Sequence, residues 1–287
     1  AGFESIELMH INVDVDRAMI HVPVVDLDLT ESSGPIVIEN GEISGRDLTS
    51  RLGNHYGSNG SFALGLSGDN HLFKLDLDID ADLAELPKTL HHLIANQYFR
   101  NEVLKFSSTG RKMGHLTIGD DLRDFTVDVR ISDLTDAEIS YSRLPWPFRF
   151  HGGMLHIEDE RIEWEKVAAT AGPHEIRETT GRLAWDDAML PFALENLQAE
   201  FDAGSLYEQL AAYPRINNSL LAGLTSVAGR AVVEKGSAAG RILAPADWKY
   251  SLSGMVGDVN VVTEKLPETI IIKEAVLSID EKSLTAT

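Results

Sequence analysis

Apolar and polar residues alternate along much of this chain, and this period of two limits the folds that the chain can form. Leu75, Leu77 and Ile79 are separated by aspartates, and the segment 125–132 follows the same pattern. Successive side chains of a strand point to opposite faces, so each such segment predicts a strand with one apolar and one solvated face.

A second regularity is a repeat with a spacing of 122 residues. The segment 136–145, DAEISYSRLP, matches the segment 258–267, DVNVVTEKLP, and the apolar positions that follow keep their register without a gap. The same spacing relates Asp202 to Asp80. Long-period repeats are typical of proteins built from stacked copies of one unit. The predicted boundaries are a tail of one unit at 1–23, units at 24–144 and 145–266, and the start of a further unit at 267–287.

Within a unit, turn residues and the spacing of leucines predict how the strands are joined. Asn40-Gly41 predicts a turn, and the change of parity across Gly152-Gly153 predicts a tight turn or a bulge. Leucines at helical spacing predict one helix after a strand end at Asp80 and another after Asp202. The residues that carry these two helical patterns are Leu83, Leu86, Leu90, Leu93 and Ile94, and Leu206, Leu210, Ile216, Leu220, Leu221 and Leu224. Pro87 suits the first turn of the earlier helix, and Pro214 is expected to divide the later one.

These patterns together predict a mainly β (α+β) fold. Repeated antiparallel strands are expected to form an elongated, twisted, groove-like sheet with about one helical segment per 122-residue unit. Because the alternating patterns run into both ends of the chain, we expect it to be a piece of a longer protein, with any export signal or membrane anchor outside it.

Composition excludes several classes of function. With 45 acidic and 25 basic residues, the formal net charge of −20 would repel nucleic acid and anionic membrane surfaces. Cysteine is absent, which removes disulfides, thiolate metal sites and cysteine nucleophiles. The glycine-rich loops that bind nucleotide phosphates are also absent from the sequence.

The motifs that could bind a metal or carry out catalysis are better explained as structural features of strands and turns. Asp76, Asp78, Asp80 and Asp82 alternate along one strand, and alternate strand residues do not converge on one calcium ion, so they predict a solvated face. His91-His92, His151 and His156 lack the spacing of zinc ligands, and the sequence predicts no metal site and no cofactor. The segment His151-Gly152-Gly153 is typical of a turn, since no nucleophile elbow accompanies it.

Large aromatic side chains leave two interpretations open. Trp146, Trp164, Trp185 and Trp248 can be ordinary core residues, or they can line a groove for a lipid or other ligand.

The chain resembles the AsmA-like superfamily. The resemblance rests on the segment 144–155, LPWPFRFHGGML, on Ile162, on the strand Thr180-Gly181-Arg182-Leu183, and on the Phe201-Asp202 strand end with its leucine-bearing helix. It spans most of the chain, although its motifs are hydrophobic patterns without an invariant chemical residue. It implies a periplasmic location in a Gram-negative envelope, an inner-membrane anchor outside this chain, and bridge-like phospholipid transport toward the outer membrane.

We therefore expect a non-enzymatic envelope segment that binds or transports phospholipid or another acyl lipid, or assists outer-membrane assembly, with envelope proteins as further partners. The candidate groove residues are Phe125, Val127, Val129, Phe148, Phe150, Leu155, Ile157, Ile270, Ile272, Leu277 and Ile279. One alternative is a structural or protein-binding scaffold with a closed β core. An enzyme acting on carbohydrate or lipid is a third hypothesis, based only on carboxylates such as Glu158, Asp159 and Glu160.

Overall fold

The computed structural model of the chain consists mainly of antiparallel strands in an open sheet, which confirms the predicted fold class. The structure describes residues 9–22, 27–66, 70–185, 188–212, 223–264, 266–280 and 283–287. The chain divides into two compact units. Unit 1 comprises Ala1–Arg143 and Leu155–Glu160, and unit 2 comprises Leu144–Met154 and Arg161–Thr287.

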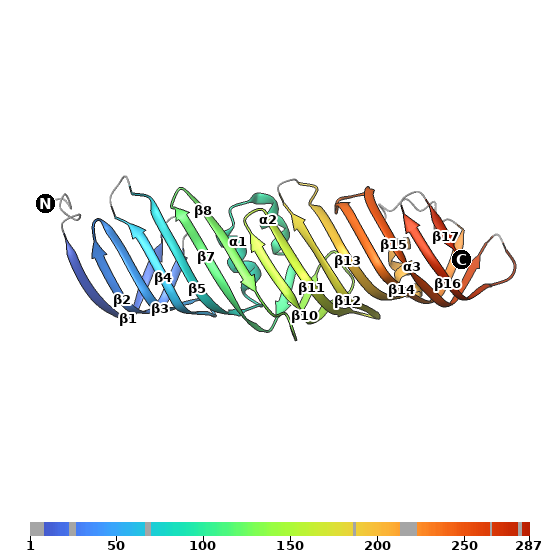
Figure 1. The fold of residues 1–287 in the computed structure, drawn as a ribbon, viewed down its shortest axis with the longest axis horizontal. Coiled ribbons are helices and arrows are strands. Elements are labelled where there is room, and N and C mark those ends of the chain that lie inside the picture. The colour runs from blue at the N-terminus through green and yellow to red at the C-terminus, as the bar shows by residue number, and fades with distance from the viewer. Residues whose placement is uncertain are drawn as a thin grey trace. The chain divides into compact units, whose positions relative to one another are not determined.

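In unit 1, strands that follow one another in sequence pair side by side from β1 to β5, and β7, β8 and the end of β10 continue the ladder (Figure 1). Two short strands, β6 and β9, pair with each other. The strands are β1 (His10–Val22), β2 (Leu27–Glu39), β3 (Glu42–Leu52), β4 (His55–Gly65), β5 (Leu72–Asp82), β6 (Phe106–Thr109), β7 (Arg111–Asp121), β8 (Asp124–Ile131), β9 (Glu138–Tyr141) and the Leu155–Glu158 part of β10 (Phe148–Glu158).

Bulges interrupt the first strands of unit 1. Arg17, Glu31, Asp47 and Asn59 each have a φ near +50°, and the strand register shifts close to each of them. A bulge bends its strand and increases the local twist, so bulges on neighbouring strands curve the sheet. The regular alternation of the sequence does not reveal these positions, although Asp47 and Asn59 belong to the residue types that most readily adopt this conformation.

The Asn40-Gly41 turn is confirmed. It joins β2 to β3, and both residues have positive φ values, 51° and 75°. Two central residues with positive φ match the type I′ hairpin turn, whose twist suits the strands on either side.

Two helices cover part of one face of the sheet in unit 1, which we call the inner face (Figure 1). Helix α1 (Leu86–Leu93) has Pro87 in its first turn, as predicted, and buries Leu86, Leu90 and Leu93. Helix α2 (Gln97–Val103) was not predicted, and it begins where the side chain of Asn96 accepts hydrogen bonds from the next turn. The largest fully buried side chains of the described residues all belong to unit 1, and they are Phe73, Ile94, Ile118, Val127, Ile131 and Leu134.

Unit 2 is built, like unit 1, from antiparallel strands. Its further strands are β11 (Arg161–Ala171), β12 (His174–Ala184), β13 (Pro191–Asp202), β14 (Leu224–Arg241), β15 (Ala244–Thr263), β16 (Ile270–Asp280) and β17 (Leu284–Ala286). Helix α3 (Ala203–Ala212) follows β13 directly, and the Asp202 side chain accepts a hydrogen bond from the backbone N–H of Ser205 at 2.8 Å. This contact satisfies one of the free N–H groups at the start of the helix.

Several sequence predictions need correction. Strand β5 extends to Asp82 rather than ending at Asp80. Leu224 begins β14 instead of ending a helix, because it pairs with Thr263 of β15. Ile216, Leu220, Leu221 and Pro214 lie outside the described residues.

The glycine pair in β10 forms no turn. Strand β10 runs through Gly152 and Gly153, and Gly153 adopts a φ of +110° inside the strand. A Cβ atom on Gly153 would lie 2.6 Å from the Cα atom of Val167, so only glycine allows this close approach. Of the two predicted possibilities, a local irregularity in the strand is therefore the one that forms.

Among the helices of the described residues, none has both the length and the apolar character needed to span a membrane.

Candidate functional site

The candidate site is an apolar groove on the inner face of unit 1. Its walls are apolar side chains of neighbouring strands, and helix α1 closes one end with Leu86, Leu90 and Leu93. The free space between these side chains is about 70 Å³. Ligand pockets of proteins commonly have volumes of roughly 300–1,000 Å³, so a ligand of that size would enter by moving the lining side chains apart. The strand residues that form the apolar walls are Val15, Ile20, Leu29, Ile36, Leu48, Leu52, Phe62, Leu75, Leu77, Ile79, Leu116 and Val129.

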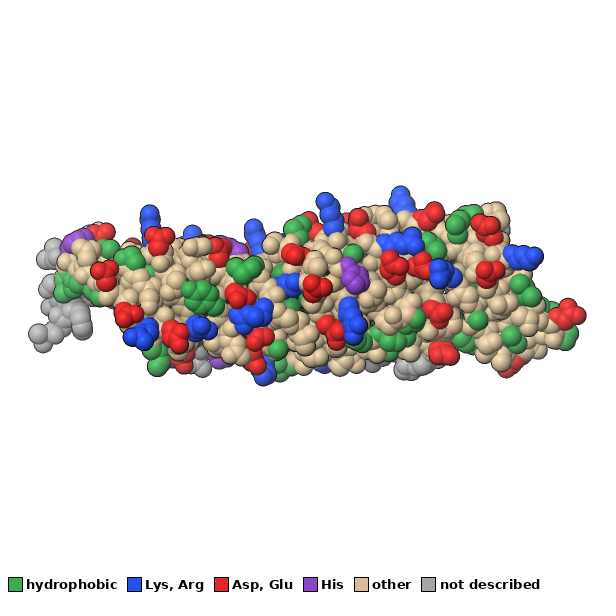
Figure 2. Space-filling model, turned by 90° about the horizontal axis from the view of Figure 1, so that it is seen from below, with side chains coloured by type: hydrophobic (Ala, Val, Ile, Leu, Met, Phe, Trp, Pro, Cys, Tyr) green, Lys and Arg blue, Asp and Glu red, His purple; other side chains and the backbone are tan. Residues whose placement is uncertain are grey.

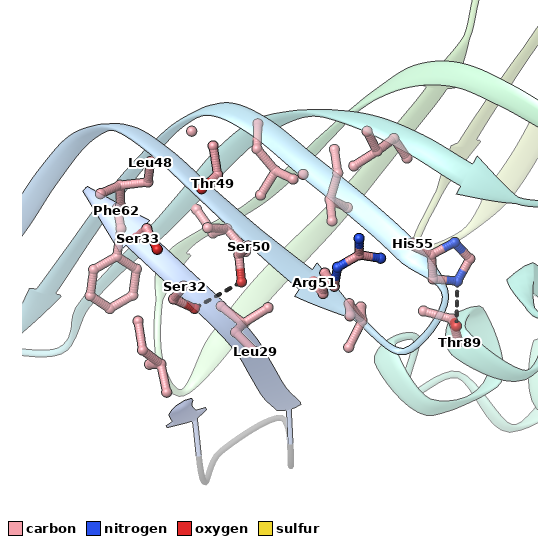
Figure 3. Close-up of a pocket in the computed structure, with 18 of the residues that line it drawn as sticks. Leu29, Ser32, Ser33, Leu48, Thr49, Ser50, Arg51, His55, Phe62 and Thr89 are labelled. Carbon is pink, nitrogen blue, oxygen red and sulfur yellow. Dashed lines mark hydrogen bonds between the residues drawn. The ribbon is translucent and has the colours of Figure 1, made fainter. Parts of the chain in front are cut away.

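Polar side chains are a minority of the lining, and several of them are hydrogen-bonded within the protein. The hydroxyl groups of Ser32 and Ser50 lie 2.9 Å apart (Figure 3). Arg51 donates from its Nε to Glu31 at 2.8 Å. Because the two serine hydroxyl groups bond to each other, they add little polarity to the inner surface. The groove therefore suits an apolar ligand.

His55 lies at the end of the groove beside α1. Its Nε2 atom lies 2.9 Å from the hydroxyl oxygen of Thr89 on α1, as Figure 3 shows, and its Nδ1 accepts a hydrogen bond from the backbone N–H of Asp82. Because Nδ1 is an acceptor, the ring proton lies on Nε2, which donates to Thr89. Burial, the largest influence, lowers the pKa of His55 below its ordinary value. The neutral ring thus connects the strand end to the helix.

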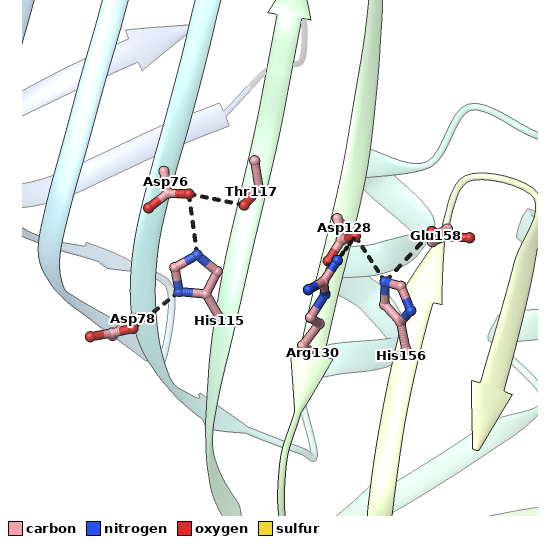
Figure 4. A network of polar contacts seen from close by, with 8 residues as sticks. All are labelled: Asp76, Asp78, His115, Thr117, Asp128, Arg130, His156 and Glu158. Atoms are coloured by element: carbon pink, nitrogen blue, oxygen red, sulfur yellow. Dashed lines mark hydrogen bonds and ion pairs between the residues drawn. The ribbon is translucent and has the colours of Figure 1, made fainter. Parts of the chain in front are cut away.

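A row of polar side chains crosses the outer face of the same sheet (Figure 4). His115 on β7 lies between two aspartates of β5, with Nδ1 at 3.0 Å from Asp78 and Nε2 at 3.2 Å from Asp76. Hydrogen bonding to Asp78 raises the pKa of His115. Two aspartates of the predicted acidic face of β5 thus bond to a histidine on the neighbouring strand β7.

The same row continues on β8 and β10. Asp128 accepts hydrogen bonds from Arg130 at 3.0 Å and from Nε2 of His156 at 2.8 Å, and Glu158 lies 3.6 Å from the same His156 nitrogen. Partial burial opposes ionisation of Asp128, but the bonds from Arg130 and His156 outweigh it and lower the pKa of the carboxyl group. Sequence reasoning missed this cluster because Asp128 lies on another strand from His156.

The predicted groove residues of unit 1 lie on the inner face, with different exposures. Val127, Val129 and Ile157 are buried, and Leu155 is half-buried. Val129 lines the groove. The side chain of Phe125 lies outside the described residues. Most of the groove comes instead from β1 to β5, which the sequence prediction did not include.

The predicted residues of unit 2 do not lie in the groove of unit 1. Phe148 and Phe150 are half-buried, and their ring centroids are 6.4 Å apart. On β16, Ile270 is exposed, whereas Ile272, Leu277 and Ile279 are half-buried.

The tryptophans pack within unit 2. Trp146 meets the ring of His174 edge-on at a centroid distance of 4.6 Å, Trp248 meets Phe192 at 5.1 Å, and Trp185 is buried. The Trp164 ring lies close above Gly181, where a Cβ atom would be only 2.5 Å away. These contacts favour the core interpretation of the tryptophans.

No protein-family model, curated protein or solved structure matches the chain. The resemblance to the AsmA-like superfamily, together with the location and activity that it implies, therefore stays a prediction.

Proposed function

We propose that the inner groove of unit 1 binds an acyl chain of a phospholipid. We further propose that the polypeptide is a non-enzymatic segment of a cell-envelope protein that handles lipids. The observation that carries this proposal is the mainly apolar lining from β1 to β5, in which the hydroxyl groups of Ser32 and Ser50 bond to each other.

The dimensions of the groove support an acyl ligand. Neighbouring strands lie about 4.8 Å apart, so the span from β1 to β5 is roughly 19 Å. The acyl chains of one leaflet occupy roughly 15 Å, which is half of the hydrocarbon core of a bilayer. The lining is therefore long enough to lie along one acyl chain, which would enter by moving the side chains apart, because they leave only about 70 Å³ of free space.

The energetics also favour lipid. Transferring one methylene group from water to an apolar surface is favourable by about 0.8 kcal/mol, so each part of the acyl chain that enters the groove strengthens binding. The surface seen from below in Figure 2 has a different character, because acidic and basic side chains are interspersed over it. Charges of both signs keep an open sheet soluble and discourage association through its strands.

The open sheet supports lipid handling over the alternative of a scaffold with a closed β core. In a closed core, the inner side chains would pack against one another. Here the apolar side chains of β2 to β4 border a small free space of about 70 Å³.

The test is lipid binding by chain purified from a Gram-negative host. Native mass spectrometry and extraction are expected to show co-purifying phospholipid, and a fluorescent fatty acid is expected to bind and be displaced by phospholipid. Ser50→Phe places an aromatic ring in the groove. If the ring excludes four methylene groups, binding weakens by about 3 kcal/mol, or roughly a hundredfold.

The matched control is Ser58→Phe, because Ser58 pairs with Asp78 on the neighbouring strand and faces the outer side of the sheet. This variant is expected to bind as wild type does. Ser50→Ala is expected to bind normally as well, and thermal unfolding of each variant separates misfolding from a blocked groove. Absence of bound lipid in the wild type, or equal losses in both phenylalanine variants, would contradict the proposal.

A further inference from the structure

Three potential metal ligands meet on the outer face of unit 1. Asp128 on β8 lies directly opposite Glu158 on β10, and His156 stands two residues before Glu158 on the same face. One ligand atom from each of the three residues lies within 4.8 Å of the other two (Figure 4). We propose that Asp128, His156 and Glu158 form a binding site for a divalent transition-metal ion such as Zn²⁺. The site lies on the other face of the sheet from the groove, so it does not depend on lipid binding.

Cross-strand pairing gives the first argument. Two carboxylates directly opposite each other on neighbouring strands repel, which destabilises the pair. Asp128 and Glu158 form such a pair, and both side chains are about 30% exposed, at 27% and 31%. A divalent cation held by both carboxylates would remove the repulsion.

The donor set gives the second argument. An imidazole nitrogen with two carboxylate oxygens is a mixed N/O set, which suits zinc and its first-row neighbours better than calcium or magnesium, which prefer oxygen alone. Three protein ligands leave the fourth position of a tetrahedral zinc ion to water. His156 Nε2 already faces both carboxylates, at 2.8 Å from Asp128 and 3.6 Å from Glu158.

Arg130 competes with the metal ion. Its guanidinium donates to both carboxylate oxygens of Asp128, at 3.0 and 3.1 Å. The Arg130 side chain is 64% exposed, and exposed ion pairs contribute little to stability. The metal ion can therefore displace the guanidinium, and removing Arg130 should strengthen metal binding.

His115 provides a matched comparison on the same face. It also contacts two carboxylates, but through different ring nitrogens, Nδ1 to Asp78 and Nε2 to Asp76. A single ion cannot be bound by both nitrogens of one ring. Among the described residues, the cluster of Asp128, His156 and Glu158 is the group in which three ligand atoms converge.

The test is titration of the tag-free 287-residue chain with Zn²⁺ after treatment with a chelator, followed by isothermal calorimetry. Wild type is expected to bind one equivalent saturably. His156→Ala, Asp128→Asn and Glu158→Gln are each expected to weaken binding at least about tenfold, which is the loss that even outer-shell partners of metal ligands produce. Arg130→Gln is expected to bind several times more tightly, and Mg²⁺ and Ca²⁺ are expected to compete poorly.

His115→Ala is the control and is expected to bind Zn²⁺ as wild type does. Circular dichroism checks that each variant folds. If His156→Ala does not fold, the nearly isosteric Asp128→Asn and Glu158→Gln variants still test the site. Co²⁺ bound to the wild type should give an absorption spectrum that Asp128→Asn loses. An isotherm without saturation near one equivalent, or equal losses in the two histidine variants, would overturn the proposal.

Discussion

The Nδ1 atom of His55 accepts a hydrogen bond from the backbone N–H of Asp82 at 3.1 Å, and this bond joins two strand ends in unit 1. In unit 2, Nδ1 of His174 accepts the corresponding bond from Asp202 at 3.2 Å. In both units the aspartate is the last residue of a strand that leads into a helical segment. Positions 55 and 174 lie 119 residues apart and positions 82 and 202 lie 120 apart, so this contact equates Asp202 with Asp82 rather than with Asp80.

The bond predicts that acid destabilises the protein through His55. Burial lowers the pKa of this ring, Arg111 lowers it further, and the carboxylates of Asp82, Glu85 and Asp80 oppose the shift. The unfolded chain takes up a proton near pH 6.5 while the folded ring does not, so stability is present above this pH and is lost as the pH falls below it. Urea unfolding between about pH 7.5 and pH 5 should show this loss.

The variant for this prediction is His55→Gln. It should cost about 1 kcal/mol at neutral pH, the worth of a typical hydrogen bond, and should lose less further stability on acidification than wild type. His92→Gln, on the exposed side of α1, serves as the control and should follow the wild-type pH profile. The same profile in all three proteins would contradict the role of His55.

Glu102 is predicted to be the carboxylate whose loss most weakens unit 1. Its buried side chain accepts hydrogen bonds from Tyr141, Arg143 and Lys105. Burial by itself raises the pKa of Glu102, but the bonds from these three groups outweigh it and lower the pKa to about 2. Glu102→Gln should therefore reduce the free energy of unfolding by on the order of 3 kcal/mol at pH 7.

The pH dependence of Glu102 is a second check. A carboxyl group with a lowered pKa stabilises the fold above its unfolded value of 4.5, and this contribution is lost as the pH falls toward 2. Denaturant unfolding at pH 7 and pH 3 should show that Glu102→Gln and wild type converge in acid. Glu160→Gln, at an exposed position, should change stability little at either pH.

Two glycines of β15 are predicted to respond differently to the same substitution. A Cβ atom on Gly254 would lie 1.9 Å from the carbonyl oxygen of Val232, whereas the nearest atom to a Cβ on Gly257 is 3.9 Å away. Because backbone cannot move aside cheaply, Gly254→Ala should destabilise the protein by about 1–3 kcal/mol. Thermal unfolding should show Gly257→Ala within about 0.5 kcal/mol of wild type. Equal effects at the two positions would contradict the close approach of β14.

The bulge at Lys166 of β11 predicts an unusual tolerance of glycine. Lys166 has a φ of 48°, a conformation that costs a residue with a Cβ atom roughly 1–2 kcal/mol. Lys166→Gly should therefore be more stable than Glu165→Gly by about this amount, since the neighbouring glycine brings only the loss of backbone order. Chemical denaturation of the two variants gives the difference directly, and a more stable Glu165→Gly protein would rule out the bulge.

Local features were predictable because they depend on neighbours in the chain. Alternation along β5 and β8, the Asn40-Gly41 turn and the position of Pro87 follow from side-chain direction and backbone sterics within a few residues. Helix α2 escaped prediction because it is short and lacks a repeated leucine pattern, and the signal that could have revealed it is the N-capping Asn96.

The sequence by itself determined that the protein is built from antiparallel strands with one apolar face, because strand periodicity is a local property. Only the tertiary structure decided where that face stays open. The groove at Leu48 and Leu77 depends on bulges and on how far α1 extends over the sheet. Likewise, strand register places Asp128 beside Glu158, 30 positions later in the chain, and a shift of one residue would move them to opposite faces.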